Sequence, residues 1–472
     1  MIRTFARHKV RKQTELTGCL WEFEPCCGEY GGQKFTLATP GCWENHPLFA
    51  DYRGEGIFRK CFPATGDIRI ECKGVSHTAT VYLDGRKIAH HYNAYTPFSV
   101  IVSDLQPGEH MLEIKADNRF HEESALHVPN DYMSYGGVSR PVVVEELNEI
   151  YLEYVHVKTY MKDKKWHARI STAISVLKTG QCKGKEITVK GRIRNTNTVF
   201  DWKLSLTEQE HYELQKELEI DDVKPWSPED PQLYSVELQV TRGKKILDDI
   251  IDRFGFREIC VEGQNIRLNG KSLRIKGVCR HEDHPDYGCA LPYQTIYNDL
   301  VLVQQMGANS IRTAHYPNDK IFQDMCFDLP DVISCNLYPG WYVDKPVKDY
   351  LDEVYGWIEE DGKGKGKPFI VSEIGAGGLY GCHNAYHGKW TEEYQADALT
   401  EQVTECLEFP ECLGVYIWQF CDVRVSREWF AGRPREMNNK GIVDEYRRPK
   451  AAYTKVAEIF KRYSDYYDND KG

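Results

Sequence analysis

The stretch 367-KPFIVSEIGAGG-378 determines how the rest of the chain is interpreted. Its apolar run 369–371 follows a proline and is typical of a parallel strand that is buried on both faces. Glu373 stands where such a strand ends. In a (β/α) barrel the carboxyl ends of the strands form the active-site face, and the glycines that follow allow the backbone to approach a substrate closely. We therefore interpret Glu373 as a candidate catalytic carboxylate; the alternative is that it caps the next helix.

The region around this stretch alternates between strand-like and helix-like patterns, which is typical of βα units and a parallel sheet. A closed barrel of this class has eight strands, so a region with five strand-like runs lacks about three βα units, or roughly 90 residues. The strand-like runs are 272–280, 309–317, 331–342, 368–376 and 413–422, and the helix-like runs are 293–307, 319–328, 349–361 and 392–408.

The first 260 residues predict two all-β regions. From Leu20 to about Glu146, short alternating segments predict an antiparallel β-sandwich without a helix of consequence, with turns at Asp84-Gly85 and Pro107-Gly108. The second block, of about 110 residues, has the length of an immunoglobulin-like sandwich. Its proline-rich segment 224–234 is predicted to be a loop, because proline cannot sit in a central strand ladder.

Composition limits the possible partners. The formal net charge is -11, and the absence of a basic stripe argues against nucleic acid. Residues 1–15 lack a signal-peptide core and no run is long enough to cross a bilayer, so we expect a cytoplasmic protein without membrane contact.

The 16 cysteines are scattered and predict reduced, mostly buried thiols. His281, His284 and Cys289 leave a four-ligand zinc site incomplete, so we predict no metal site.

Six motifs in the last region occur in an order that resembles glycoside hydrolase family 2, and within it the β-glucuronidases. Two further stretches in the first region, 42–62 and 131–142, strengthen the resemblance. It implies a jelly-roll sugar-binding domain at 1–147, an immunoglobulin-like β-sandwich at 148–260 and a (β/α)8 TIM-type catalytic barrel at 261–472, here shortened by about three βα units. The motifs are LRIKGVCRHEDHP (273–285), MGANSIRTAHYPND (306–319), SCNLYPGWY (334–342), PFIVSEIGAGG (368–378), YIWQFCD (416–422) and NNKGIVDEYRRPKAAY (438–453).

The resemblance also implies a role for individual residues. Glu373 is expected to be the nucleophile of a retaining glycosidase that needs no cofactor. For the binding residues, ordinary packing at strand ends is the alternative interpretation. Asp131 is expected to reach the sugar hydroxyls from the first domain, Asn336, Tyr338 and Tyr342 to line the pocket, Trp418 to stack beneath the sugar, His281 and His315 to flank the site, and Asn438 and Lys440 to bind the carboxylate of a glucuronide.

The chain departs from the family at the acid/base residue. Retaining hydrolysis needs a second carboxyl about 5 Å from the first, and its loss removes a factor of about 10² to 10⁴ in rate. The family places it in an Asn-Glu pair on the fourth barrel strand, but the only Asn-Glu pair here, Asn148-Glu149, lies at the boundary of the first region. Glu282 and Asp283 are the nearest candidates to replace it. We therefore expect a β-glucuronidase-type site with impaired activity.

Two other functions are compatible with the same residues. The first is a β-galactosidase-like specificity, because galactosidases of the family carry a similar N-x-K-G sequence. The second is a non-catalytic sugar-binding protein that keeps the rim of the pocket. In each case the partner is a small glycoside. Relatives commonly form dimers or tetramers, but the sequence itself does not determine the oligomeric state.

Overall fold

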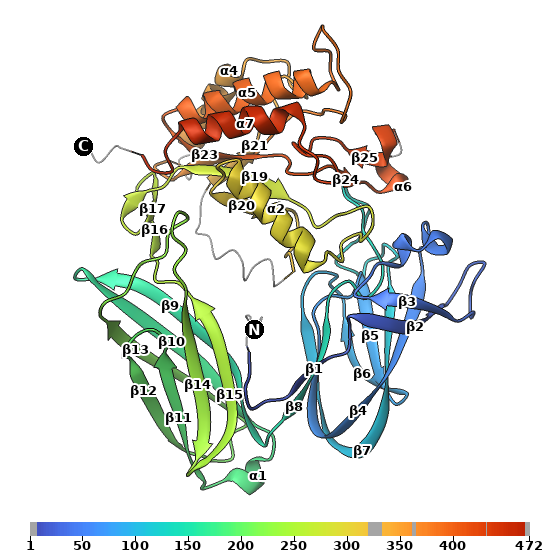
Figure 1. Ribbon diagram of the computed structural model, residues 1–472, viewed down its shortest axis with the longest axis vertical. Helices are drawn as coiled ribbons and strands as arrows, with labels where there is room; N and C mark the ends of the chain where they lie inside the picture. Colours follow the sequence, from blue (N-terminus) through green and yellow to red (C-terminus); the bar gives the residue numbers. More distant parts are fainter. Residues whose placement is uncertain (1–6, 320–332, 361–364, 431, 468–472) are drawn as a thin grey trace.

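The computed structural model describes residues 7–319, 333–360, 365–430 and 432–467 (Figure 1). Two β regions lie side by side, and the mixed region with the helices α2, α4, α5 and α7 lies across one end of both. No helix in the described ranges combines the length and the apolar character that crossing a bilayer requires.

The first region has the antiparallel strands that the alternating pattern predicts, and its eight strands are hydrogen-bonded into one sheet rather than into the two separate sheets of a simple sandwich. Its strand order is β1-β8-β4-β7-β5-β6, with β2 and β3 attached at β4. Alternate side chains point into one core, where Phe58, Ile70 and Ile114 are almost fully buried. The elements are β1 (Gln13–Glu15), β2 (Cys19–Pro25), β3 (Phe35–Thr39), η1 (Trp43–Asn45), η2 (Pro47–Phe49), β4 (Glu55–Cys72), β5 (Thr78–Leu83), β6 (Arg86–His91), β7 (Phe98–Asp117) and β8 (Val142–Leu147).

One of the two predicted turns in this region is wrong. Asp84 and Gly85 do connect β5 to β6, and both have positive φ values, of 50° and 78°. Strand β7 instead runs through Pro107-Gly108 without a break, because it pairs with β4 along most of its length. The register between the two strands shifts between Ala64 and Gly66, opposite this proline. Such a bulge leaves one residue out of the ladder, and this is where a proline can be accommodated.

The second region is a sandwich of two antiparallel sheets, with strand orders β13-β10-β9 and β12-β11-β14-β15. These seven strands fit the predicted immunoglobulin-like size. Residues 224–233 lie outside the strands, as their prolines predict. The elements are β9 (Ile150–Lys162), β10 (Lys165–Val176), α1 (Thr179–Cys182), β11 (Glu186–Ile193), β12 (Val199–Ser205), β13 (His211–Ile220), β14 (Tyr234–Arg242) and β15 (Lys245–Phe254).

The third region contains the predicted five-stranded parallel sheet, in the order β20-β19-β23-β22-β21. Strands β20 and β21 are at opposite edges and do not pair with each other in the described residues, so this sheet does not close into a barrel. The strands are β16 (Ile259–Glu262), β17 (Asn265–Leu268), β18 (Lys271–Ser272), β19 (Ile275–Arg280), β20 (Ser310–Thr313), β21 (Ile333–Asn336), β22 (Phe369–Ile374), β23 (Cys412–Ile417), β24 (Val423–Arg424) and β25 (Met437–Asn438).

The helices of this region pack on the sheet and are mostly those that the periodicity predicts. The predicted helix at 319–328 lies outside the described residues except for its first position, and the last helix, α7, was not predicted. Apolar residues of α5 and α7, including Leu399 and Phe460, share one core with Val371 and Val415 of the sheet. The helices are α2 (Tyr293–Gln305), α4 (Val347–Glu360), α5 (Glu392–Glu408), α6 (Arg427–Phe430), η3 (Pro434–Glu436) and α7 (Ala451–Arg462).

All fifteen cysteines in the described part of the chain are free thiols. Four of them are exposed, so the prediction of mostly buried thiols holds only in part. Cys289, one of the residues weighed as a metal ligand, lies with its sulfur 3.6 Å from that of Cys42 in the first region.

Candidate functional site

Glu373 is held by residues from both edges of the parallel sheet. It lies in β22, whose six residues are all buried, and is itself 5% exposed. Arg312 Nη1, from β20, donates to Glu373 Oε1 at 2.8 Å, and the Tyr338 hydroxyl, just after β21, donates to Oε2 at 2.7 Å. Burial and the neighbouring Glu373 raise the pKa of Tyr338, which keeps this phenol a proton donor. The carboxylate is therefore oriented by one hydrogen bond to each oxygen.

Two histidines and a tryptophan lie beside this carboxylate. His315 Nε2 is 4.0 Å from Glu373 Oε1, and the His315 ring stacks on Trp418 at 4.7 Å between centroids and 17° between planes. His281 meets Trp418 edge-on, and its Nε2 is buried without a hydrogen-bond partner. Burial first, and then the neighbouring His315, lower the pKa of His281 well below its usual value. His281 is therefore neutral, and His315 covers one face of Trp418.

Lys440 lies in a group of aromatic rings. Its ammonium donates to the Tyr342 hydroxyl at 2.7 Å and lies 5.7, 5.7 and 4.8 Å from the ring centroids of Tyr338, Trp341 and Tyr342. Burial lowers the pKa of Lys440, although the Tyr342 hydrogen bond opposes that shift. Within the described ranges, no carboxylate lies within ion-pair distance of this ammonium.

Asp131 reaches the same place from the first region. Its Oδ2 accepts from Arg433 Nη2 at 2.6 Å and from Asn438 Nδ2 at 3.1 Å. Its Oδ1 is buried without a hydrogen-bond partner, as is Asn438 Oδ1. Burial raises the pKa of Asp131, against the opposing effect of Arg433 and Lys440. Unsatisfied buried polar atoms are rare in folded proteins, and these are suitably placed to bind a hydroxylated ligand.

The structure brings all ten residues of the predicted site into one cluster, which we call the site cluster. Asn336 joins it through Ser372, whose hydroxyl donates to Asn336 Oδ1 at 2.8 Å, beside Glu373. The sequence did not single out Arg312 as a site residue, although it lies three residues before His315 in the same motif. It also gave no sign of which residue Arg433 would contact. The cluster comprises Asp131, His281, His315, Asn336, Tyr338, Tyr342, Glu373, Trp418, Asn438 and Lys440.

Neither candidate for a replacement acid is free. Glu282 Oε2 accepts from Arg140 at 2.8 Å and Oε1 from the Asp319 backbone N–H at 2.6 Å. Asp283 accepts from the Tyr135 hydroxyl at 2.5 Å and from the Arg424 backbone N–H at 2.7 Å. Both oxygens of each carboxylate are thus engaged, and Arg140 and Tyr135 belong to the first region. These two acids link the first region to the third.

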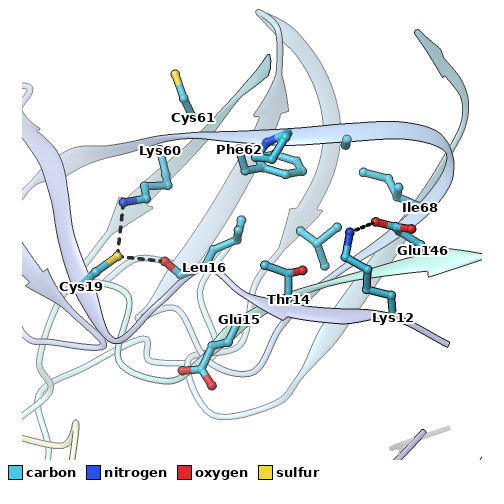
Figure 2. Close-up of a pocket in the computed structure, with 13 residues that line it drawn as sticks. Lys12, Thr14, Glu15, Leu16, Cys19, Lys60, Cys61, Phe62, Ile68 and Glu146 are labelled. Carbon is cyan, nitrogen blue, oxygen red and sulfur yellow. Dashed lines mark hydrogen bonds and ion pairs between the residues drawn. The ribbon is translucent and has the colours of Figure 1, made fainter. Parts of the chain in front are cut away.

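Two features outside the site cluster have the form of a binding site: a cavity and a group of possible metal ligands. A cavity of about 240 Å³ in the first region is lined by residues of β1, β2, β4 and β8 and by the residues next to β1, and by none of the site cluster (Figure 2). Its charged lining residues include Lys12, Lys60 and Glu146. In the described part of the chain, one group has the spacing of metal ligands: His8, Asp248 and Asp249. Its carboxylates are already occupied. Asp248 binds Arg11 at 2.5 Å, and Asp249 accepts the backbone N–H groups of Lys9 and Val10.

Comparison with solved structures gives relatives over the full length. A GH2 beta-galacturonidase from Eisenbergiella tayi, solved with bound galacturonate, is 40% identical with a TM-score of 0.91, covering 99% of this chain and 100% of that chain. The Bifidobacterium dentium beta-glucuronidase complexed with coumarin-3-O-glucuronide has a TM-score of 0.82 at 18% identity, covering 99% of this chain and 100% of that chain, and shows a shared fold.

Curated relatives carry several names. A beta-galactosidase from Thermoanaerobacter pseudethanolicus is 27% identical over 309 residues, in an alignment that covers 62% of this chain and 40% of that protein. A beta-glucuronidase from Streptococcus agalactiae is 22% identical over 537 residues, in an alignment that covers 84% of this chain and 86% of that protein. The chain thus spans less than half the length of the first curated relatives it matches.

Two family models match most of the chain. "Glycosyl hydrolases family 2, TIM barrel domain" matches residues 259–330 and 327–464, and "Glycosyl hydrolases family 2" matches residues 150–257. Together with the full-length similarity to the Eisenbergiella protein, these matches cover the three regions. The chain therefore belongs to glycosyl hydrolase family 2, a family of glycosidases.

Proposed function

We propose that the site cluster binds β-linked uronic acid glycosides and that Glu373 is the nucleophile of a retaining reaction. The observation that carries this proposal is the pairing of the charges in the site. Arg312 is paired with Glu373, and Arg433 is paired with Asp131. Lys440 donates to the Tyr342 hydroxyl and, among the described residues, is paired with no carboxylate, so its positive charge is available to a ligand.

A uronate carboxylate fits this available charge. A buried anion needs both an opposite charge and hydrogen bonds, and the ammonium of Lys440 supplies both. The unpaired Asp131 Oδ1 and Asn438 Oδ1 can accept hydrogen bonds from sugar hydroxyls. The galacturonate bound to the Eisenbergiella relative supports a uronate as the class of ligand.

The chemistry at Glu373 follows from its two donors. Arg312 and Tyr338 stabilise and orient the carboxylate, so that one oxygen can attack the anomeric carbon. The bond from that carbon to the glycosidic oxygen breaks, the aglycone leaves with the electron pair, and a glycosyl-enzyme intermediate forms. Hydrolysis of this intermediate then requires a base that activates water. We propose that the acid/base carboxylate is absent, which lowers turnover by about 10² to 10⁴.

Three observations support a shortened barrel. The sheet is open between β20 and β21, the strands on either side of residues 320–332. The two matches to the barrel family model meet at residues 327–330. The alignment with the Streptococcus relative extends over 537 residues although it covers only 84% of this chain of 472 residues, so the relative has residues that this chain lacks. We propose that three βα units are absent at this point, within a catalytic region that follows a sugar-binding and an immunoglobulin-like domain.

The proposal is tested with purified chain and three aryl glycosides, the 4-nitrophenyl β-glucuronide, β-galacturonide and β-galactoside. We expect slow cleavage of a uronide and a higher kcat/KM for at least one uronide than for the galactoside. A preference for the galactoside would favour the second candidate, a β-galactosidase-like specificity, which the names of several curated relatives support. Uronate binding by calorimetry without any cleavage would indicate a sugar-binding protein instead.

A further inference from the structure

The turn that carries Lys440 is held on both sides by one buried carboxylate. Asp422 Oδ2 accepts from Asn439 Nδ2 at 3.3 Å, and Asp422 Oδ1 accepts from the backbone N–H of Gly441 at 2.9 Å. Asp422 is 1% exposed and is not part of the site cluster. One side chain therefore fixes the residue before Lys440 and the residue after it.

A buried lysine connects this turn to the loop that follows Glu373. Lys450 Nζ donates to Asp422 Oδ1 at 2.8 Å and to the carbonyl oxygen of Gly378 at 2.6 Å. The side chains of both Asp422 and Lys450 are 0% exposed. The backbone adds a direct link, because Gly378 N donates to the carbonyl oxygen of Asn439 at 2.9 Å. The loop that follows the strand of Glu373 and the turn that carries Lys440 are thus bonded to each other.

A second buried side chain bridges the same two loops. Gln395, on α5 and 0% exposed, donates through Nε2 to the carbonyl oxygens of Ala376 and Gly441, each at 3.0 Å. The carbonyl oxygen of Lys440 also accepts from Gln419 N at 3.0 Å. The backbone of Lys440 is therefore fixed, and its side chain points into the aromatic group.

Burying an ion pair is expensive, and apolar residues of similar volume would often serve stability equally well. The hydrogen bonds of this pair reach backbone atoms of Gly378 and Gly441 and the side chain of Asn439. They thus connect the loop that follows the strand of Glu373 with the turn that carries Lys440, and each of these two residues supplies one group of the proposed reaction. We propose that Asp422 and Lys450 are positioning residues that set the separation between Lys440 and Glu373 and thereby the preference for uronides. This inference rests on the proposed function.

The test uses the whole chain and two kinds of measurement. Asp422→Asn removes one charge, and the double variant Asp422→Asn/Lys450→Met removes both, so that no unpaired buried charge prevents folding. Lys455→Met is the matched control: it makes the same lysine-to-methionine change at an exposed position of α7, where the lysine pairs with Glu458. Hydrogen exchange of the peptides around 375–380 and 438–443 reports on the positioning without any ligand. The uronide-to-galactoside ratio of kcat/KM, or of Kd where turnover is too slow, reports on recognition.

We expect both loops to exchange about tenfold faster in the folded variants, while the β regions and the control variant keep their wild-type rates. We expect the uronide preference to fall by about tenfold or more, because a displacement near 1 Å can cost about 10²-fold. If both loops of a folded double variant exchange their amide hydrogens at the wild-type rate, the positioning role of Asp422 and Lys450 is overturned. Faster exchange with an unchanged uronide preference overturns the role in specificity. A wild-type chain that neither binds nor prefers uronides refutes the proposed function, and the exchange result alone then decides the positioning role.

Discussion

Replacement of Lys440 by methionine is the most direct test of the charge pairing in the site. Methionine keeps most of the length of the side chain among Tyr338, Trp341 and Tyr342, so packing changes little. A hydrogen bond to a charged group is worth about 1.5–3 kcal/mol, and each 1.4 kcal/mol is about tenfold. We therefore expect kcat/KM for uronides to fall about 10- to 150-fold. A galactoside has no carboxylate to lose, so its kcat/KM is expected to change little.

A neighbouring lysine provides the control for this experiment. Lys389 lies 5.5 Å from the centroid of the same Trp341 ring and donates to the Trp341 carbonyl oxygen, but it is exposed and not part of the site cluster. Lys389→Met is expected to leave the uronide-to-galactoside ratio unchanged. The assay is release of 4-nitrophenol from both substrates, with calorimetry of free uronate as a second measure. Equal losses on the two substrates in Lys440→Met would refute the claim that this ammonium recognises a carboxylate.

Three further predictions concern chemistry and stability. Glu373→Gln is expected to abolish turnover while the chain still binds uronate; wild-type rates would show that Glu373 is not the nucleophile. Without a proton donor, aryl glycosides with acidic leaving groups should be cleaved about 10² to 10⁴ faster than alkyl glycosides, and similar rates for both would reveal a donor. Burial lowers the pKa of His77 to about 3, from 6.5. As the pH falls, His77 therefore takes up its proton in the unfolded chain at a higher pH than in the folded chain. The free energy of unfolding should fall by about 1.4 kcal/mol per pH unit between pH 6.5 and pH 3. Denaturant titration should show that the free energy of unfolding depends less on pH in His77→Gln than in the wild type. An unchanged pH dependence would contradict the lowered pKa of His77.

The strands were predictable where burial is complete, and their arrangement was not. All six residues of β22 and of β23 are buried, which is why these runs read as parallel strands in the sequence. The position of β20 and β21 at opposite edges depends on pairings between distant segments. Pro107-Gly108 is a local turn signal that was overridden by the pairing of β7 with β4.

The same distinction applies to the site. Glu373 and Lys440 were found because each lies in a short motif at the end of a strand or in a turn. Arg433 could not be assigned, since its partner Asp131 is 302 residues away in the chain. The positioning role of Asp422 was also invisible, because an aspartate after a strand gives no sign of which backbone atoms it will bind.

The open sheet still brings side chains from both of its edges to Glu373. Strand β20, which carries Arg312, is separated from β22 by β19 and β23, so in a flat sheet the two strands would be about 14 Å apart. Arg312 nevertheless donates to Glu373 at 2.8 Å. The Arg312 side chain reaches across the intervening strand β19, where the same nitrogen also contacts Cys279 Sγ at 3.4 Å, and a long arginine and glutamate together span a separation of this size. Side chains from both edges therefore meet over the carboxyl ends of the strands, and the groups proposed to bind the sugar and to attack it are held by strands that the chain has. The proposed absence of three βα units would also remove the group that faces Glu373 across the opening, and this predicts a chain that recognises its glycoside better than it turns it over.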